Sequence, residues 1–340
     1  MLRRASHAQW LADPFHALAI RATRFGSIDA EHRVNEPSVG RQTVLQTNQP
    51  LPEGFELEGF RIERVLARGG FSFVYLAHSD VHGQVALKEY LPAWLALRTG
   101  LDPWPTVDDG NSSAFRHGLR CFFEEGRALA DLRHPNVVRV LDFFRANGTA
   151  YLVMHYERGR SLQEQIAACR GSTSEDWIRK TFGSLLTGLR EVHATMRLHL
   201  DIKPGNIFIR DDGVPLLVDF GAARNALSSD SAALDHIFTP GFAAPEQDGT
   251  PEALGPWTDI YSVGASMYAC IAATPPPRAS ERSQTDDLTA ALRECAEEYS
   301  PGLLDIVAWC LRLDPEERPP SVLALQKALR GEVAPCATAA

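Results

Sequence analysis

The sequence predicts an α+β fold of two lobes, a smaller one built on an antiparallel sheet with one key helix and a larger one that is mainly helical. Strand patterns separated by turns occupy a first lobe at about residues 55–156, and helical periodicity occupies a second lobe at about 159–330. The chain has 340 residues, enough for one large or two ordinary domains, and it contains no tandem repeats. We therefore expect one folded region at 55–330.

The two ends of the chain are expected to lie outside this folded region. Residues 1–54 lack sustained periodicity and are interrupted by prolines, so we predict a mostly irregular tail with a possible helix near His7–Ala22. Residues 331–340 are predicted to form a short C-terminal tail.

Apolar alternation and turn residues give the order of elements in the first lobe. A strand from Phe60, a turn containing glycines, a second strand, a polar turn and a third strand predict an antiparallel meander. A helix is expected next, because apolar residues recur on one face between Phe115 and Leu132 before His134-Pro135-Asn136 ends the pattern. The expected strands of this lobe are 60–66, 73–77, 84–90, 137–143 and 150–156.

Helices dominate the second lobe. The longest apolar run of the chain, Tyr261–Ala273, falls in this region and is too short to span a bilayer, so we interpret it as a buried helix and expect no membrane span. The predicted helices are 161–169, 174–195, about 258–272, and 303–311.

Composition and charge favour a globular protein and exclude several classes of partner. Hydrophobic residues make up 44% of the chain and charged residues 23%, as in soluble domains. The net charge of −9 argues against a nucleic-acid partner, which requires a basic field. Six cysteines lie far apart without a C-x-x-C pair, and the N-terminus lacks the apolar stretch of a secretory signal. We therefore expect free thiols and a cytoplasmic location.

Three short motifs in the folded region carry groups suited to one chemistry. Lys88 lies in a V-A-L-K strand, and Asp201 and Asn206 lie in H-L-D-I-K-P-G-N. Asp219 begins D-F-G after a buried apolar run, 18 positions after Asp201. In their order and spacing these motifs resemble those of the eukaryotic-like (bacterial) Ser/Thr protein kinase family, and the resemblance covers roughly 55–330.

This resemblance implies the bilobal protein-kinase fold and an ATP-dependent Ser/Thr protein kinase that transfers the γ-phosphoryl group to protein hydroxyls, including its own. The implied cofactors are ATP and Mg²⁺, with Mn²⁺ as an alternative metal. Asp201 would accept the proton of the attacking hydroxyl, and Lys203 would balance the charge that develops on the phosphoryl group. Asn206 and Asp219 would bind the metal ions.

The resemblance also places nucleotide-binding residues in both lobes. Lys88 would contact the phosphates and pair with Glu125, which stands nine positions before the His134-Pro135-Asn136 turn, where the family places this glutamate. The adjacent Glu124 would point about 100° away around the helix. The glycine loop departs from the family pattern G-x-G-x-x-G-x-V at Ala67 and Ser72. These substitutions are expected to affect how tightly ATP binds more than whether it binds at all. The implied nucleotide-binding residues are Ala67, Gly69, Gly70, Ser72, Val74, Ala86, Lys88, Glu125, Met154, Tyr156 and Phe208.

Further motifs imply architectural roles. Residues 239–246, which end in A-P-E, resemble the segment that docks a peptide substrate, and Glu246 would form a structural ion pair with Arg318. Asp259 would hydrogen-bond the backbone of the catalytic loop. His199 would pack beneath the D-F-G segment and would not act as a general base.

Two departures from the family pattern bear on regulation. Lys88 and Glu125 are 37 positions apart, and the extra sequence within 90–115 is apolar and proline-containing. It is expected to add packing to the first lobe, and either it or the N-terminal tail offers a surface for a regulatory partner. Leu200 stands immediately before Asp201, where many family members carry an arginine that pairs with a phosphate on the activation loop. The loop is therefore expected to be of the non-RD type, which lacks this Arg-Asp pair, and not to need that phosphate.

Two other functions compete with an active protein kinase. A pseudokinase, a scaffold module without turnover, is favoured slightly by Ala67 and Ser72 but opposed by the complete set of site residues. A small-molecule kinase is opposed by the peptide-docking segment at 239–246. Fold alone could not separate these functions.

Overall fold

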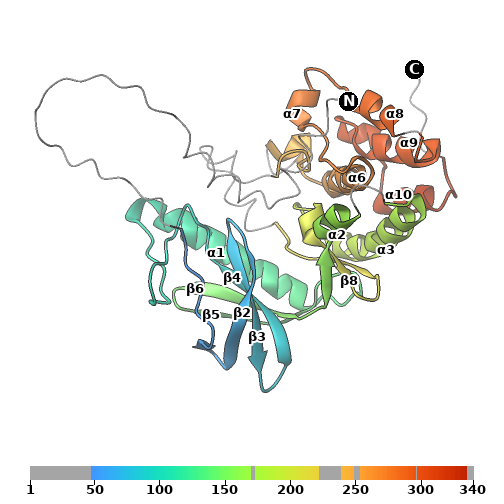
Figure 1. The fold of residues 1–340 in the computed structure, drawn as a ribbon. Helices are drawn as coiled ribbons and strands as arrows, with labels where there is room; N and C mark the ends of the chain where they lie inside the picture. Colours follow the sequence, from blue (N-terminus) through green and yellow to red (C-terminus); the bar gives the residue numbers. More distant parts are fainter. Residues whose placement is uncertain (1–46, 170–172, 222–238, 249–252, 296, 335–340) are drawn as a thin grey trace, which may run out of the picture.

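The computed structural model describes residues 47–169, 173–221, 239–248, 253–295 and 297–334, and these form the two expected lobes (Figure 1). The possible helix near His7–Ala22 lies outside the described residues, as does the C-terminal tail from residue 335. A six-stranded antiparallel sheet and one long helix make up the first lobe, and helices make up most of the second.

The sheet of the first lobe confirms the predicted meander. Its strand order is β1-β2-β3-β4-β6-β5, with antiparallel pairing throughout. Apolar residues on alternate positions of the strands face a buried core, which fixes the register of each strand. The strands are β1 (Glu56–Leu57), β2 (Phe60–Arg68), β3 (Ser72–Ser79), β4 (Gly83–Tyr90), β5 (Val140–Ala146) and β6 (Thr149–His155).

One strand starts later than the sequence predicts. The prediction placed a strand at 137–143, but β5 begins at Val140. The reason is that the Val138 N–H donates to the Leu217 carbonyl at 2.9 Å, so this stretch joins the second lobe instead of the sheet. The chain between the helix and β5 is therefore a contact between the lobes.

The helix α1 (Ser112–Ala130) lies against the sheet (Figure 1). It starts three residues before the predicted Phe115 and buries Phe115, Phe122 and Leu129 on one face. A Cβ atom at Gly126 would lie 2.1 Å from Leu152 Cδ2 on β6, so glycine permits this close approach. The approach brings the inner face of α1, with Glu125 on it, against the sheet.

The second lobe is built around α6 (Pro256–Ala272), which is buried along most of its length. This confirms the interpretation of the longest apolar run as a buried helix, and no helix among the described residues has the length and apolarity needed to cross a membrane. A small sheet, whose Leu217 contacts the chain before β5, contains β7 (Gly159–Ser161), β8 (Ile207–Arg210) and β9 (Pro215–Leu217). The other helices are α2 (Leu162–Ala168), α3 (Glu175–Ala194), α7 (Ala279–Arg282), α8 (Leu288–Glu294), α9 (Pro301–Cys310) and α10 (Val322–Leu329).

The lobes are joined through Asn136, a buried residue that follows α1. Its Nδ2 donates to the Pro215 carbonyl at 2.6 Å, and its Oδ1 accepts from Thr187 Oγ1 at 2.9 Å. Gly188 on α3 lies directly beneath it, and an added Cβ would come within 2.9 Å of the Asn136 carbonyl oxygen. Because the nearest atoms are the Cβ and the backbone carbonyl of Asn136, a larger residue at this position would require the chain to shift.

Replacing this glycine therefore tests the junction. We expect Gly188→Ala to lower the free energy of unfolding by about 1–3 kcal/mol through overpacking, although alanine is the better helix former. Gly183→Ala on the same helix is the matched control, since no atom lies within 4 Å of its added Cβ. That control should be neutral or stabilising by up to about 1 kcal/mol. Equal effects of the two variants in urea unfolding would contradict this account of the junction.

The ion pair predicted between Glu246 and Arg318 is present. Arg318 Nη1 and Nη2 donate to the two carboxylate oxygens of Glu246 at 2.7 and 2.9 Å, and neither side chain is more than 8% exposed. The same guanidinium donates to the carbonyls of Trp257, Arg312 and Leu313 at 3.1, 2.8 and 3.0 Å. All five N–H donors are thus satisfied, and the segment that ends at Glu246 is fixed to the core.

Breaking this pair should be costly. We expect Arg318→Met to reduce the free energy of unfolding by about 3–5 kcal/mol, because the Glu246 carboxylate would remain buried without its countercharge. The control is Arg61→Met, since the pair of Arg61 with Glu56 is 68% exposed on both sides and exposed pairs contribute at most about 1 kcal/mol. A loss below about 1 kcal/mol for Arg318→Met would mean that the pair does not hold the segment.

Candidate active site

The loop that carries Asp201 is held from below by Asp259 on α6. The fully buried Asp259 carboxylate accepts hydrogen bonds from the backbone N–H groups of His199 and Leu200 at 2.9 and 2.8 Å. The His193 ring lies 2.8 Å from the same carboxylate. Leu200 has a φ of +63°, which a non-glycine residue adopts only when its surroundings enforce it. The predicted role of Asp259 is therefore confirmed, and it fixes the direction in which Asp201 projects.

The Asp201 carboxylate is surrounded by donors from the next turn of chain. Asn206 Nδ2 lies 2.5 Å from Asp201 Oδ2 and 2.9 Å from the Asp201 carbonyl. Lys203 Nζ lies 3.2 Å from Asp201 Oδ2 and donates to Thr239 Oγ1 at 2.8 Å. Asp201 is only 9% exposed, so its orientation is set by these neighbours. The arrangement leaves an oriented carboxylate beside a lysine that also contacts the segment leading to Glu246.

Asp219 and Lys88 meet across the gap between the lobes. Lys88 on β4 is 8% exposed, and its Nζ forms an ion pair with Asp219 Oδ1 at 3.1 Å. The same Nζ lies 5.4 Å from the centre of the Phe122 ring on α1. Glu125 follows Phe122 by one turn and is 6% exposed. The face of α1 that carries Glu125 thus points toward Lys88. The pairing of Lys88 with Glu125 stays a prediction.

The oxygen atoms of Asp219 and Asn206 fit a hard divalent cation. Asn206 uses its amide nitrogen for hydrogen bonds, so its Oδ1 is the atom that would bind a metal, and the Asp219 side chain is 34% exposed. The described residues contain no group of three His, Cys, Asp or Glu side chains that could hold a metal by themselves. Mg²⁺ bound by a few protein oxygens commonly completes its coordination with phosphate oxygens and water.

His199 is a packing residue, as predicted. Its ring is fully buried, stacks on Phe220 at 4.3 Å between centroids, and places Nε2 3.1 Å from the Val218 carbonyl. Burial holds the pKa of His199 below its usual range, so the ring is neutral at physiological pH. It supports the D-F-G segment and does not face the site as a base.

The glycine loop forms the tip of the β2–β3 hairpin. Ala67 pairs with Val74 in register, and the Gly69 N–H donates to the Ser72 carbonyl at 2.9 Å. Gly69 and Gly70 therefore lie at the tip, as the sequence suggested. Ala67 and Gly69 are exposed, and Ser72 is half-buried at the start of β3.

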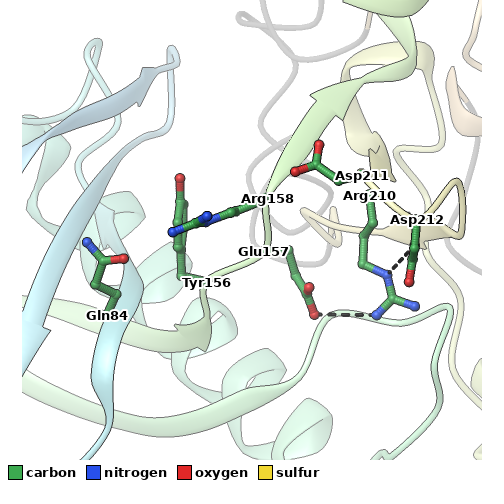
Figure 2. Close-up of a pocket in the computed structure, with 7 residues that line it drawn as sticks. All are labelled: Gln84, Tyr156, Glu157, Arg158, Arg210, Asp211 and Asp212. Atoms are coloured by element: carbon green, nitrogen blue, oxygen red, sulfur yellow. Dashed lines mark ion pairs between the residues drawn. The ribbon is translucent and has the colours of Figure 1, made fainter.

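The residues expected around the base of the nucleotide lie in two groups. Val74, Ala86 and Met154 share one apolar cluster, in which Ala86 and Met154 are direct partners on β4 and β6. Tyr156 lies apart from this cluster, in a pocket at the connection between the lobes (Figure 2). Phe208 is half-buried on β8. A nucleotide contact for each of these residues stays a prediction.

The pocket in Figure 2 is polar and charged. Glu157 and Arg210 form an ion pair at 3.6 Å across it, and Arg210 also lies 3.5 Å from Asp212. The pocket thus lies between the chain that follows β6 and the turn that follows β8. Its lining residues are Gln84, Tyr156, Glu157, Arg158, Arg210, Asp211 and Asp212.

Sequence reasoning missed two features near the site. Gln247 Nε2 donates to the Leu200 carbonyl at 3.0 Å and thereby fastens the A-P-E segment to the catalytic loop. Arg98 forms a buried ion pair with Glu89, the residue after Lys88. A single arginine within an otherwise apolar stretch was the signal for the second feature, since a charge in such a position needs a buried partner.

Comparison with known proteins assigns the fold to a family. The family model for the protein kinase domain matches residues 108–329, which is more than half of the chain. A solved structure described as the PpkA-294 apo form is 35% identical in sequence and has a TM-score of 0.75. The match covers 82% of this chain and 99% of the chain in that structure.

Curated relatives point the same way. Serine/threonine-protein kinase C of Synechocystis is 27% identical over 80% of this chain and 49% of its own length. Serine/threonine-protein kinase PknK of Mycobacterium tuberculosis is 34% identical over 63% of this chain and 18% of its own length. The chain thus spans about half or less of the length of these two relatives. Together with the geometry of the site, the comparisons show that this chain belongs to the protein kinase domain family.

Proposed function

We propose that this chain is an ATP-dependent protein kinase that phosphorylates serine and threonine hydroxyls of proteins, including its own. The observation that carries the proposal is the position of the Asp201 carboxylate, which Asn206 and Lys203 orient beside the segment expected to dock a peptide. The names of the curated relatives above support the Ser/Thr class.

The geometry supports a direct transfer. Asp201 accepts the proton of the substrate hydroxyl while that oxygen attacks the γ-phosphorus. The bond from the γ-phosphorus to the bridging oxygen breaks, and ADP leaves. Lys203 lies 3.2 Å from Asp201 and stabilises negative charge on the transferring group. Lys88 holds the α- and β-phosphates from the first lobe.

Asp219 and the Oδ1 of Asn206 are the groups proposed to hold Mg²⁺. When bound, the metal neutralises negative charge on the phosphate oxygens. Asp219 lies 3.1 Å from Lys88, so a metal ion bound by Asp219 would add its positive charge to that of Lys88 beside the nucleotide phosphates.

The two competing functions receive less support. A pseudokinase that binds without turnover commonly lacks one of the groups at Lys88, Asp201, Asn206 or Asp219, and all of them are present here. A small-molecule kinase would have no need for the segment at 239–246, which Gln247 and the ion pair of Glu246 attach to the catalytic loop and the core.

Two isosteric substitutions test the roles directly. We expect Asp201→Asn to lower kcat by about 10²–10⁴, because the hydroxyl proton loses its acceptor. Asp219→Asn should abolish Mg²⁺-dependent transfer, because a charged metal ligand is lost. The measurement is transfer of γ-labelled phosphate to a protein substrate at saturating ATP, with thermal unfolding to verify the fold. Near-wild-type turnover of either variant would show that the roles are wrong.

We also propose that activity does not depend on phosphorylation of the activation loop. Leu200 cannot pair with a phosphate, and its backbone is already held by Asp259 and Gln247. An ordering role for a loop phosphate requires an arginine at this position or nearby. The loop itself, including Ser228 and Arg224, lies outside the described residues.

This proposal predicts the effect of dephosphorylation. Phosphatase-treated enzyme, and a variant with Ser228, Ser229 and Ser231 changed to alanine, should phosphorylate an exogenous protein at close to the untreated rate. Thr239 is left intact, because its hydroxyl accepts from Lys203. A large loss of activity that rephosphorylation restores would contradict the proposal and point to Arg224.

A further inference from the structure

We propose that residues 91–98, which we call the clamp, hold the glycine loop in place over the ATP phosphates, and that Trp94 and Arg98 are positioning residues for phosphate binding. The inference rests on the proposed function, because that function assigns the loop to the phosphates. The kinase family model matches from residue 108 onward, after the clamp.

The clamp contacts the tip of the glycine loop directly. The Ala93 N–H donates to the Gly70 carbonyl at 2.8 Å, and the Leu91 N–H donates to the Phe71 carbonyl at 2.9 Å. The rings of Phe71 and Trp94 meet edge to face, with 4.3 Å between centroids and 83° between planes. The Trp94 carbonyl also lies 3.5 Å from Asn111 Nδ2, at the start of α1.

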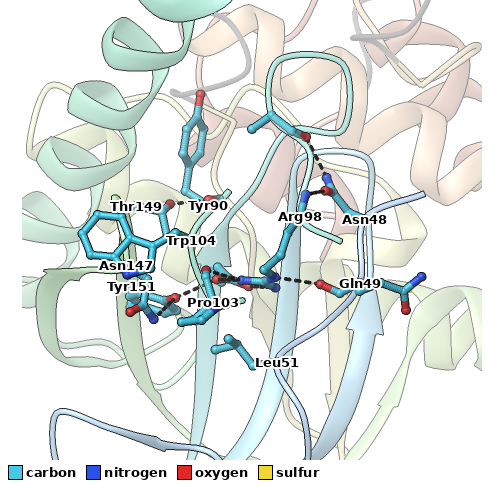
Figure 3. Close-up of polar contacts among 12 residues, drawn as sticks. Asn48, Gln49, Leu51, Tyr90, Arg98, Pro103, Trp104, Asn147, Thr149 and Tyr151 are labelled. Atoms are coloured by element: carbon cyan, nitrogen blue, oxygen red, sulfur yellow. Dashed lines mark hydrogen bonds and ion pairs between the residues drawn. The ribbon is translucent and has the colours of Figure 1, made fainter. Parts of the chain in front are cut away.

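The other end of the clamp is anchored inside the first lobe (Figure 3). Arg98 is 2% exposed and Glu89 is fully buried, and the guanidinium binds both carboxylate oxygens at 2.5 and 2.7 Å. The hydroxyls of Tyr75 and Tyr151 each donate to Glu89 at 2.7 Å. Burial, the largest effect, lowers the pKa of Arg98, but hydrogen bonding and charge attraction to Glu89, together with the nearby Tyr75 and Tyr151, raise that pKa overall. A charge pair satisfied in this way fixes the clamp rigidly to β4.

The chain just before the folded region closes over this anchor (Figure 3). Asn48 Oδ1 accepts from the Arg98 N–H at 2.6 Å, and Asn48 Nδ2 donates to the Ala96 carbonyl at 3.0 Å. The Gln49 carbonyl accepts from Arg98 Nε at 2.8 Å, and the Gln49 N–H donates to the Arg98 carbonyl at 3.0 Å. The N-terminal segment and the glycine loop are therefore connected through one short piece of chain.

This arrangement offsets the loss of glycines from the loop. A mobile loop loses conformational entropy when it orders around a ligand, and a loop that is already ordered loses less. Two hydrogen bonds and one ring contact at the tip, together with a buried anchor, supply that order before ATP binds. The benefit applies only to ligands that the tip touches, so the clamp should strengthen binding of the phosphates and leave binding of the nucleoside unchanged.

The test compares ATP with adenosine. In calorimetry on the full chain, Trp94→Ala should weaken binding of Mg²⁺–ATP by about three- to tenfold, the range of one edge-to-face aromatic pair. Binding of adenosine should change by less than about twofold, since adenosine has no phosphates for the tip to contact. Leu101→Ala is the matched control, because Leu101 follows the clamp and is 85% exposed. It should leave both affinities unchanged.

Two further variants separate positioning from general destabilisation. Phe71→Ala combined with Trp94→Ala should weaken ATP binding no more than either single change, because both remove the same contact. Asn48→Ala should weaken ATP binding in the same direction as Trp94→Ala but by less, because the Arg98–Glu89 pair remains.

The outcomes are distinct. The clamp proposal would be overturned if Trp94→Ala weakened binding of ATP and of adenosine equally, or if it left ATP binding unchanged. It would also be overturned if the effects of the Phe71 and Trp94 substitutions on ATP binding were additive. Clamp-dependent ATP binding without phosphoryl transfer would overturn the proposed function alone. A wild-type chain that binds neither ligand would overturn both.

Discussion

The buried carboxylate of Asp259 is the constraint on which the site depends. It accepts two backbone hydrogen bonds from the catalytic loop and so holds Leu200 in a left-handed conformation. That conformation sets the direction of Asp201, whose carboxylate then meets Asn206 and Lys203. Because α6 is buried along most of its length, the loop is fastened to the core of the second lobe.

The segment expected to dock a substrate is fastened to the same core. Gln247 binds the Leu200 carbonyl, Glu246 is held by Arg318, and Thr239 meets Lys203. Asp201, the proposed proton acceptor, and the segment that would present the hydroxyl therefore share one scaffold. This is the structural basis for reading the site as one for protein substrates, since a small alcohol would need no such attachment.

Much of the fold, and the meeting of the candidate site residues, could be predicted because their signals are local. Lys88, Asp201, Asn206 and Asp219 lie in short motifs whose spacing is fixed by the strands and turns that carry them. The sequence signals that Arg98 needs a buried partner but does not identify it, because the pair with Glu89 forms only when the chain after β4 folds back on the first lobe. Asn48, 50 positions earlier in the chain, could not be predicted as its cover for the same reason. The start of β5 was missed for a similar reason, since Val138 bonds to the other lobe.

The central claim is transfer of phosphate from ATP to serine and threonine hydroxyls of proteins. The most direct measurement is phosphosite mapping by mass spectrometry after incubation of the chain with ATP, Mg²⁺ and a protein substrate, alongside a mixture of sugars and other small alcohols. The account predicts phosphoserine and phosphothreonine on the substrate and on the chain itself, and none when EDTA removes the metal. Phosphate found only on the small alcohols, or on no acceptor at all, would contradict it.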